Sequence, residues 1–299
     1  MRVQGFTKFV LFTAIILTGV VGILAQDFKT VKDGVEYADF YKETKDGPVR
    51  GNLLRLDLSK VRLDVVHARD MVVGVETTSE LARRYGALAA INTGFFKIHV
   101  GAVSGVPVGI MRINGIDYTD SYGGRAALFI TNGKDRTTVS IDRVNKETFL
   151  KVGTKSVKIG FNKIRDKDDA VIYTPIYNRT TLTNQDGIEF IVRKGRVTAV
   201  VNGKGSTEIP TDGFVISASG KKKDQLAAML KVGIRVSFER KTTSATGSPL
   251  SASVLAAEDA TAGVPQIIRD GKLNITILEE KSSKDFSETR HPQIGRAHV

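Results

Sequence analysis

The sequence has 299 residues, of which 44 are Lys or Arg and 32 are Asp or Glu, so its formal net charge is +12. It contains no Cys, which excludes disulfides, thiol catalysis and lipoprotein attachment. The basic residues are scattered, apart from one run at 221–223, and aromatic residues are not interleaved with them. Because nucleic-acid binding surfaces usually cluster their charge, this distribution predicts a solvated surface that attracts anions and no nucleic-acid partner.

The N-terminal segment indicates the compartment. Arg2 and Lys8 precede an apolar or neutral run over residues 9–24, and Ala25 is a small residue before Gln26. This order is typical of a secretory signal peptide, so we expect residues 1–25 to be removed on export. The protein is then extracytoplasmic (periplasmic, at the cell surface or secreted), most simply in a bacterium. The alternative is an uncleaved N-terminal anchor, which would be the only contact with a membrane.

The next part of the chain favours strands. Residues 26–49 are polar and predict a leader with one edge strand over 35–40. Leucines alternate over 54–58 and apolar residues alternate over 63–67, which predicts two paired strands. Thr77 and Glu80 form a capping-box pattern that predicts a short helix, and Gly86 is placed to end it.

Two hairpins and a second helix are predicted further along. Strand-like runs flank Asn132-Gly133 and Lys194-Gly195, as is typical of hairpins. Residues 222–231 predict a helix and 235–239 a strand. The polar segment 145–186 predicts an insertion or lid in which only 170–173 form a strand. The whole pattern indicates an α+β fold of strand-rich mixed sheets with a few short helices, in a single domain over residues 50–292.

An apolar run ends in a polar turn at residues 89–96, Ala-Ala-Ile-Asn-Thr-Gly-Phe-Phe. The residues before Asn92 predict a strand that is buried on both faces. Gly94 allows a tight turn or a close approach to a ligand, and Phe95 and Phe96 are expected to anchor the loop in the core. The octapeptide resembles the Ala-Ile-Asn-Gly-Gly-Phe-Phe motif of the phosphodiester glycosidase family, with Thr93 in place of a glycine.

Three further segments resemble motifs of the same family, in the same order. They are residues 212–220 (Asp-Gly-Phe-Val-Ile-Ser-Ala-Ser-Gly), residues 262–271 (Ala-Gly-Val-Pro-Gln-Ile-Ile-Arg-Asp-Gly) and residues 289–292 (Thr-Arg-His-Pro). The loop over 99–109, which contains Pro107, resembles the Gly-x-Pro-x-Gly loop of the family. The resemblance covers residues 50–292, and the ordered set is more specific than any one motif.

The last seven residues, Gln-Ile-Gly-Arg-Ala-His-Val, match the translation of a common sequencing adapter. We therefore predict that residues 293–299 are an artefact, and the alternative is a genuine basic tail. On the first interpretation, the Asp-Gly-Gly-Gly-Ser segment of the family lies beyond this chain. The domain over 50–292 is then incomplete at its C-terminus, and the catalytic site with it.

The resemblance implies a secreted hydrolase that cleaves sugar-1-phosphodiester linkages in glycans and is inactive as this chain alone. The leaving group is a phosphate monoester, which is a weak base, so neutralising the phosphate charge matters more than protonating the leaving group. His291 and Asn92 are expected to be catalytic. The glycan or sugar-phosphate substrate is expected to contact Arg290, Arg125, Gly94, Pro107 and Gly263. No cofactor is expected, and no metal, because the four histidines lack metal-ligand spacing.

Several of these residues also have a purely structural interpretation. Arg290 can form a surface ion pair with Glu288, and Asn92 can hydrogen-bond its own turn. Arg125 can act as a charged residue at a strand edge, and Gly263 can simply shape a loop. The competing function is a non-catalytic envelope protein that binds anionic glycans in the same cleft.

Overall fold

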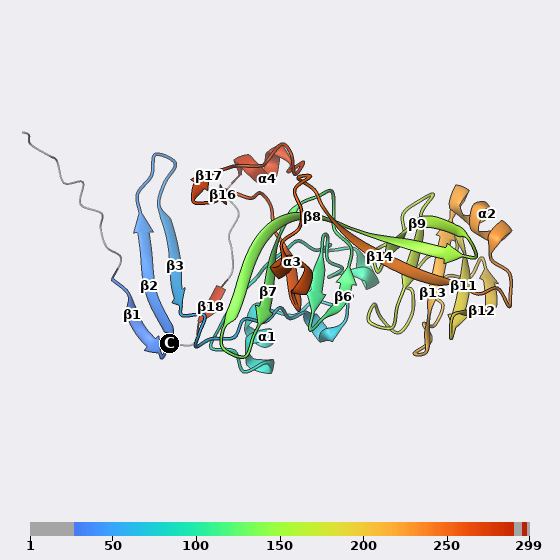
Figure 1. The fold of residues 1–299 in the computed structure, drawn as a ribbon, viewed down its shortest axis with the longest axis horizontal. Helices are drawn as coiled ribbons and strands as arrows, with labels where there is room; N and C mark the ends of the chain where they lie inside the picture. The colour runs from blue at the N-terminus through green and yellow to red at the C-terminus, as the bar shows by residue number, and fades with distance from the viewer. Residues whose placement is uncertain (1–26, 290–294, 298–299) are drawn as a thin grey trace, which may run out of the picture.

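The computed structural model describes residues 27–289 and 295–297 (Figure 1). The predicted signal segment, Arg290 and His291 lie outside the described residues. Strands dominate the described chain and the helices are few and short. The largest sheet is mixed, because β9 (Lys155–Phe161) runs parallel to β10 (Ala170–Tyr173) while its other pairs are antiparallel. The predicted fold class is therefore confirmed.

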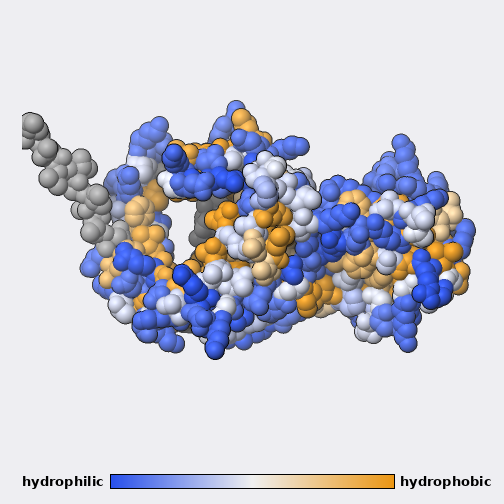
Figure 2. Space-filling model, in the orientation of Figure 1, coloured by the Kyte–Doolittle hydropathy of each residue, from blue (hydrophilic) through white to orange (hydrophobic). Residues whose placement is uncertain are grey.

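An antiparallel sheet of three strands lies at the N-terminal end, in the order β1 (Lys29–Lys32), β2 (Val35–Lys42) and β3 (Val49–Leu56). Figure 2 shows an opening between this sheet and the rest of the molecule. The strand predicted over 35–40 in the leader is present as β2, but its predicted edge position is wrong, because β2 pairs on both sides.

The prediction of a second strand near the N-terminus, over residues 63–67, is also wrong. Leu54 and Leu56 of β3 pair with Tyr37 and Val35 of β2, and residues 61–67 are irregular. Val65 is nevertheless buried, and its N–H donates to the Asp259 carboxylate at 3.4 Å. The apolar alternation over 63–67 therefore reflects packing against the body, not strand pairing.

The main sheet has eleven strands, ten of them in the order β12-β11-β13-β10-β9-β8-β7-β15-β5-β6, with β14 paired to β8. In Figure 1, β8 and β14 cross together from the middle of the molecule to the end that carries α2. Besides β9 and β10, the strands are β5 (Met111–Ile113), β6 (Ile116–Thr119), β7 (Ala126–Asn132), β8 (Thr137–Val152), β11 (Gly187–Arg193), β12 (Arg196–Asn202), β13 (Gly213–Ser219), β14 (Ser237–Ser244) and β15 (Asp259–Ala262).

The segment 145–186 is not an insertion or lid. Its first part continues β8, where residues 144–151 pair with β14, and β9 pairs with residues 148–152. The polar side chains of this part form cross-strand pairs, such as Lys151 with Glu239 at 2.7 Å. Such pairs stabilise a sheet without the apolar alternation from which strands are predicted.

Several local predictions are confirmed. Helix α1 (Thr78–Arg84) begins at a capping box formed by Thr77 and Glu80. The hairpins β7–β8 and β11–β12 are present, and the second turns at Lys194 and Gly195 with φ of 46° and 73°. Positive φ at both central residues is the type I′ geometry favoured in two-residue hairpins. Helix α2 (Gly220–Met229) begins two residues before the predicted start.

The strand before Asn92 is not buried on both faces, which corrects the prediction. Strand β4 (Ala89–Ile91) lies outside the main sheet and pairs with β18 (Gly295–Ala297), and Ile91 is 73% exposed. Phe96 is 49% exposed, so it is not a core residue, whereas Phe95 packs edge-on against Phe286. The pairing of β18 does not test the origin of residues 293–299, which stays a prediction.

The remaining described elements are short. They are the 3-10 helices η1 (Ala68–Asp70) and η2 (Gly101–Val103), the helices α3 (Ala252–Ala256) and α4 (Lys284–Glu288), and the strands β16 (Ile268–Arg269) and β17 (Lys272–Leu273). Helix α3 packs on β7 and β8, where Val254 joins Phe129 and Val144 in one buried cluster. Within the described chain, no helix has the length and apolarity needed to cross a bilayer.

Candidate functional site

Two of the segments that resemble family motifs meet at a cleft of about 340 Å³. Thr93 follows β4, Ala126–Leu128 belong to β7, and the segment 261–268 leads from β15 into β16. The cleft is lined by Thr93, Ala126, Ala127, Leu128, Ile141, Thr261, Ala262, Gly263, Val264, Pro265, Gln266, Ile267 and Ile268. The first and third motifs, far apart in the sequence, therefore contribute to one concave surface.

Close contacts hold the turn after Asn92 against β15. The Thr93 and Thr261 hydroxyl oxygens are 3.3 Å apart. Gly94 has φ of 66°, and a Cβ added to it would lie 3.5 Å from the Thr261 hydroxyl oxygen. A side chain at Gly94 would therefore be strained by its backbone conformation and would reach the rim of the cleft. Asn92 itself is exposed beside this turn.

The loop over 99–109 folds back on the residues that follow Gly94. The Val108 N–H donates to the Phe95 carbonyl, and the Gly105 N–H donates to the Lys97 carbonyl, both at 2.7 Å. Pro107 is buried and forms an isolated bridge with Phe96. The structure thus places Pro107 close to the turn that contains Gly94, although Pro107 is not among the described residues that line the cleft.

Strand β15, which carries Thr261, is fixed at its first residue. The Asp259 carboxylate is 1% exposed and accepts hydrogen bonds from the N–H groups of Asn114 at 2.6 Å and Val65 at 3.4 Å. Burial raises the pKa of Asp259 above its ordinary value. The backbone donors compensate part of the cost of burying this carboxylate.

Glu280 organises the wall of the cleft, and sequence analysis missed it. Its carboxylate is 1% exposed and accepts 2.8 Å hydrogen bonds from the N–H groups of Ala126 and Gln266. The Thr276 hydroxyl donates to the same carboxylate. Glu280 therefore ties β7 to the segment that carries Gly263, whose own N–H donates to the Ala126 carbonyl at 2.8 Å.

Arg125 lies beside this wall but does not line the cleft. Its guanidinium donates to the carbonyls of Glu280 at 3.2 Å and Lys281 at 3.3 Å, and it lies 4.8 Å from the centre of the Tyr122 ring. These contacts hold the 280–281 segment in place. In this arrangement Arg125 positions the cleft wall.

Gln266 presents the most distinctive polar group of the cleft. The side chain is 7% exposed, and its Nε2 donates to the Ile268 carbonyl at 3.2 Å. Its Oε1 is buried and has no hydrogen-bond partner among the described residues. Because leaving a buried acceptor unpaired costs about 1–3 kcal/mol, a ligand that donates to this oxygen recovers that free energy.

The described lining offers hydroxyl, amide, backbone and apolar groups. None of the described lining residues is a carboxylate or an imidazole. Elsewhere in the described chain, no group of three or more acidic, His or Cys side chains is arranged to hold a metal. The cation and base predicted from the sequence, Arg290 and His291, lie outside the described residues.

Comparison with known proteins shows similarity in fold more than in sequence. No protein-family model matches the chain. A hypothetical protein from Synechocystis superposes with a TM-score of 0.73 at 18% identity, over 89% of this chain and 48% of that one. The "Putative exported protein" of Burkholderia pseudomallei superposes with a TM-score of 0.61 at 20% identity, over 77% of this chain and 50% of that one.

A relative is also detected by sequence. An uncharacterized protein of Rickettsia conorii is 26% identical over 141 residues, which are 46% of this chain and 48% of the relative. The chain thus matches about half the length of each of these three proteins.

Proposed function

We propose that the cleft binds the sugar of a sugar-1-phosphodiester and that the protein is an extracytoplasmic hydrolase of such linkages in glycans. Two observations support this proposal: Thr93, Gly263 and Gln266 line one cleft, and the buried Gln266 Oε1 has no hydrogen-bond partner among the described residues. Sugars bring hydroxyl donors, and sites built around a buried polar group select ligands that pair with it.

The chemistry of the proposal follows from the substrate. Water attacks the anomeric carbon, the bond from that carbon to the phosphate oxygen breaks, and the phosphate monoester leaves with the electron pair. The site needs a cation near the phosphate and a base to activate the water. We assign these roles to Arg290 and His291 on the family resemblance. Asn92, exposed at the turn beside the cleft, is assigned to orient the substrate.

A second candidate function is the binding of anionic glycans without cleavage. It is favoured by the chemistry of the described lining, in which Thr93, Thr261 and Gln266 offer hydrogen bonds within mostly apolar walls. That composition is typical of a ligand-binding cleft. Both candidates use the same cleft and differ only in turnover.

The extracytoplasmic part of the proposal has two supports. One is the signal-like segment 1–25, and the other is the description of the Burkholderia pseudomallei neighbour as an exported protein. The hydrolase part rests on the ordered motifs.

The test uses N-acetylglucosamine 1-(methyl phosphodiester) as the probe. Two proteins are tested: this chain, and the product of the locus read past the codon for Pro292. Calorimetry measures binding of the probe to each protein, and release of the free sugar measures turnover. Turnover that is lost in His291→Gln and kept in the control His99→Gln, an exposed histidine, supports the hydrolase. Binding without turnover in the longer product supports the second candidate. The absence of binding rejects both.

A further inference from the structure

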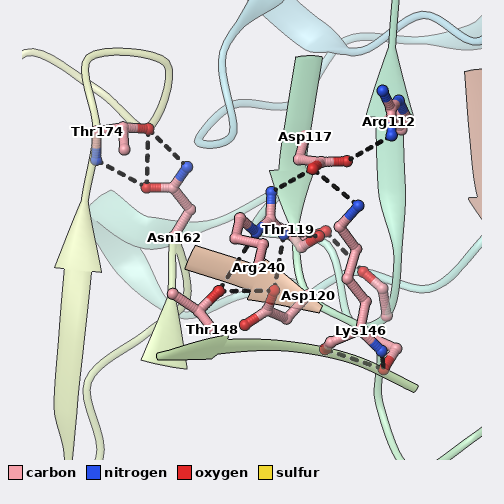
Figure 3. A network of polar contacts seen from close by, with 11 residues as sticks. Arg112, Asp117, Thr119, Asp120, Lys146, Thr148, Asn162, Thr174 and Arg240 are labelled. Atoms are coloured by element: carbon pink, nitrogen blue, oxygen red, sulfur yellow. Dashed lines mark hydrogen bonds and ion pairs between the residues drawn. The ribbon is translucent and has the colours of Figure 1, made fainter. Parts of the chain in front are cut away.

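A second group of polar residues lies outside the cleft, where β5, β6, β8 and β14 approach one another (Figure 3). Its charged members, here called the ionic cluster, are Arg112, Asp117, Asp120, Lys146 and Arg240. The side chains of Lys146 and Arg240 are only 6% and 10% exposed, and those of both aspartates 18%. Charges in such a position must be compensated, because they have lost most of their hydration.

The cations of the ionic cluster differ in how closely they pair with the carboxylates. The Asp117 carboxylate pairs with Lys146 at 2.8 Å and with Arg240 at 2.9 Å, and the Asp120 carboxylate pairs with the other guanidinium nitrogen of Arg240 at 2.7 Å. Arg112 only approaches Asp117, at 3.7 Å. Its Nε is buried and has no hydrogen-bond partner among the described residues. Arg112 therefore has the weakest ion pair of the cluster, and its side chain is 30% exposed.

The cluster carries a surplus positive charge. Three cations face two carboxylates, so the sum is +1 when all are ionised. Burial lowers the pKa of Lys146, although Asp117 opposes that shift. Burial likewise raises the pKa of Asp120, against the pull of Arg240. Both shifts reflect the cost of desolvating charge here, and one added anion would favour the charged form of Lys146.

A cavity of about 40 Å³ adjoins the surplus charge. Its polar lining residues are Arg112, Lys146 and Thr242, and the rest of the lining is apolar and includes Val254 and Leu255 of α3. No carboxylate is among the described residues that line it. Since one water needs about 10–15 Å³ by this measure, the cavity has room for a small polyatomic ion.

We propose that this cavity is a binding site for a small inorganic oxyanion held by Arg112 and Lys146. The guanidinium of Arg112 offers a planar fork of donors that matches two oxygens of phosphate, and the Lys146 ammonium adds a point charge. Thr242, the third polar residue of the lining, carries a hydroxyl that can donate to the same anion. Binding of a monoanion would bring the sum of charges in the cluster to zero. The site shares no lining residue with the cleft, so it stands independently of the proposed function.

Titration with inorganic phosphate at constant ionic strength tests the site. We expect saturable binding of one phosphate per chain by calorimetry and a rise in melting temperature with phosphate concentration. Arg112→Gln should weaken phosphate binding by about tenfold or more, because it removes a charge-assisted contact. The matched control Arg193→Gln, which removes a surface arginine paired with Asp212, should leave the affinity unchanged.

A second variant keeps the test decisive if Arg112→Gln does not fold. Thr242→Val preserves every charge of the cluster and removes only the cavity hydroxyl, so it should weaken phosphate binding without abolishing it. Absence of saturable binding to the wild-type chain would overturn the proposal. The proposal would also be overturned if Arg112→Gln or Thr242→Val left phosphate binding unchanged while Gln266→Leu abolished it. That result would show that the anion occupies the cleft.

Discussion

The Glu280 carboxylate accepts a hydrogen bond of 2.8 Å from the backbone N–H of Gln266, which places a buried carboxylate directly behind the wall of the cleft. The same carboxylate binds the N–H of Ala126, which lies 154 residues earlier in the chain. One side chain therefore joins β7 to the loop that carries Gly263 and Gln266. The shape of the cleft depends on this junction.

Glu280→Ala should destabilise the fold by about 2–4 kcal/mol, because it leaves two buried N–H groups and a hydroxyl without their acceptor. Urea unfolding measures the change in the free energy of unfolding. The matched control is Glu279→Ala, which removes an exposed glutamate one residue away and should cost less than about 0.5 kcal/mol. Equal effects of the two substitutions would show that Glu280 does not hold the wall.

The stability of the loop over 99–109 should depend on the close approach of Gly105 to Gly74. Gly105 has φ of 94°, and a Cβ added to it would overlap the carbonyl of Gly74. Gly105→Ala should therefore cost about 3 kcal/mol or more, since a backbone group cannot easily move aside. Gly101→Ala is the control, because Gly101 has φ of 65° but open space around it, so only the backbone cost of about 1 kcal/mol applies. Thermal melts of both variants check the difference, and equal costs would contradict the packing argument.

His67 should make stability depend on pH. Its Nδ1 lies 2.7 Å from the Met71 carbonyl, and burial lowers the pKa of His67 below the ordinary 6.5, although nearby carbonyls oppose the shift. Between the lowered pKa and 6.5, the unfolded state binds more protons than the folded state. The free energy of unfolding should therefore fall as the pH drops through this window and recover above it.

Urea unfolding at a series of pH values measures this contribution. His67→Gln should flatten the dependence below pH 6.5, because the titrating group is gone. His99→Gln, at an exposed histidine in a neighbouring loop, should keep the wild-type slope. A slope that persists in His67→Gln would assign the proton uptake to another group.

Local signals in the sequence predicted local structure well. The capping box at Thr77 and the turn at Lys194-Gly195 each depend on a few adjacent residues, and both are present in the structure. The strand predicted over 63–67 and the buried strand before Asn92 failed because burial there depends on distant partners. Val65 is held by Asp259, and Ile91 lies outside the main sheet and is exposed.

The candidate site was predictable only in part. The segments 89–96 and 262–271 were expected to share a site because both resemble motifs of one family, and the structure places Thr93 and Gly263 of these segments on one cleft. Glu280 belongs to no such motif. A single glutamate in a polar stretch is predicted to be exposed, and its burial becomes evident only from its partners Ala126 and Gln266. Arg112 and Lys146 were missed for a similar reason, since strands far apart in the sequence bring them together.

The central claim, that the cleft binds a sugar phosphodiester through Gln266, is tested most directly by calorimetric titration of N-acetylglucosamine 1-(methyl phosphodiester) into three proteins. They are the wild-type chain, Gln266→Leu and the control Gln225→Leu, which alters an exposed glutamine of α2. We predict that Gln266→Leu raises the Kd about tenfold, by losing one buried hydrogen bond, and that Gln225→Leu leaves it unchanged. Equal affinity of the wild type and Gln266→Leu, or no binding by the wild type, would contradict the account.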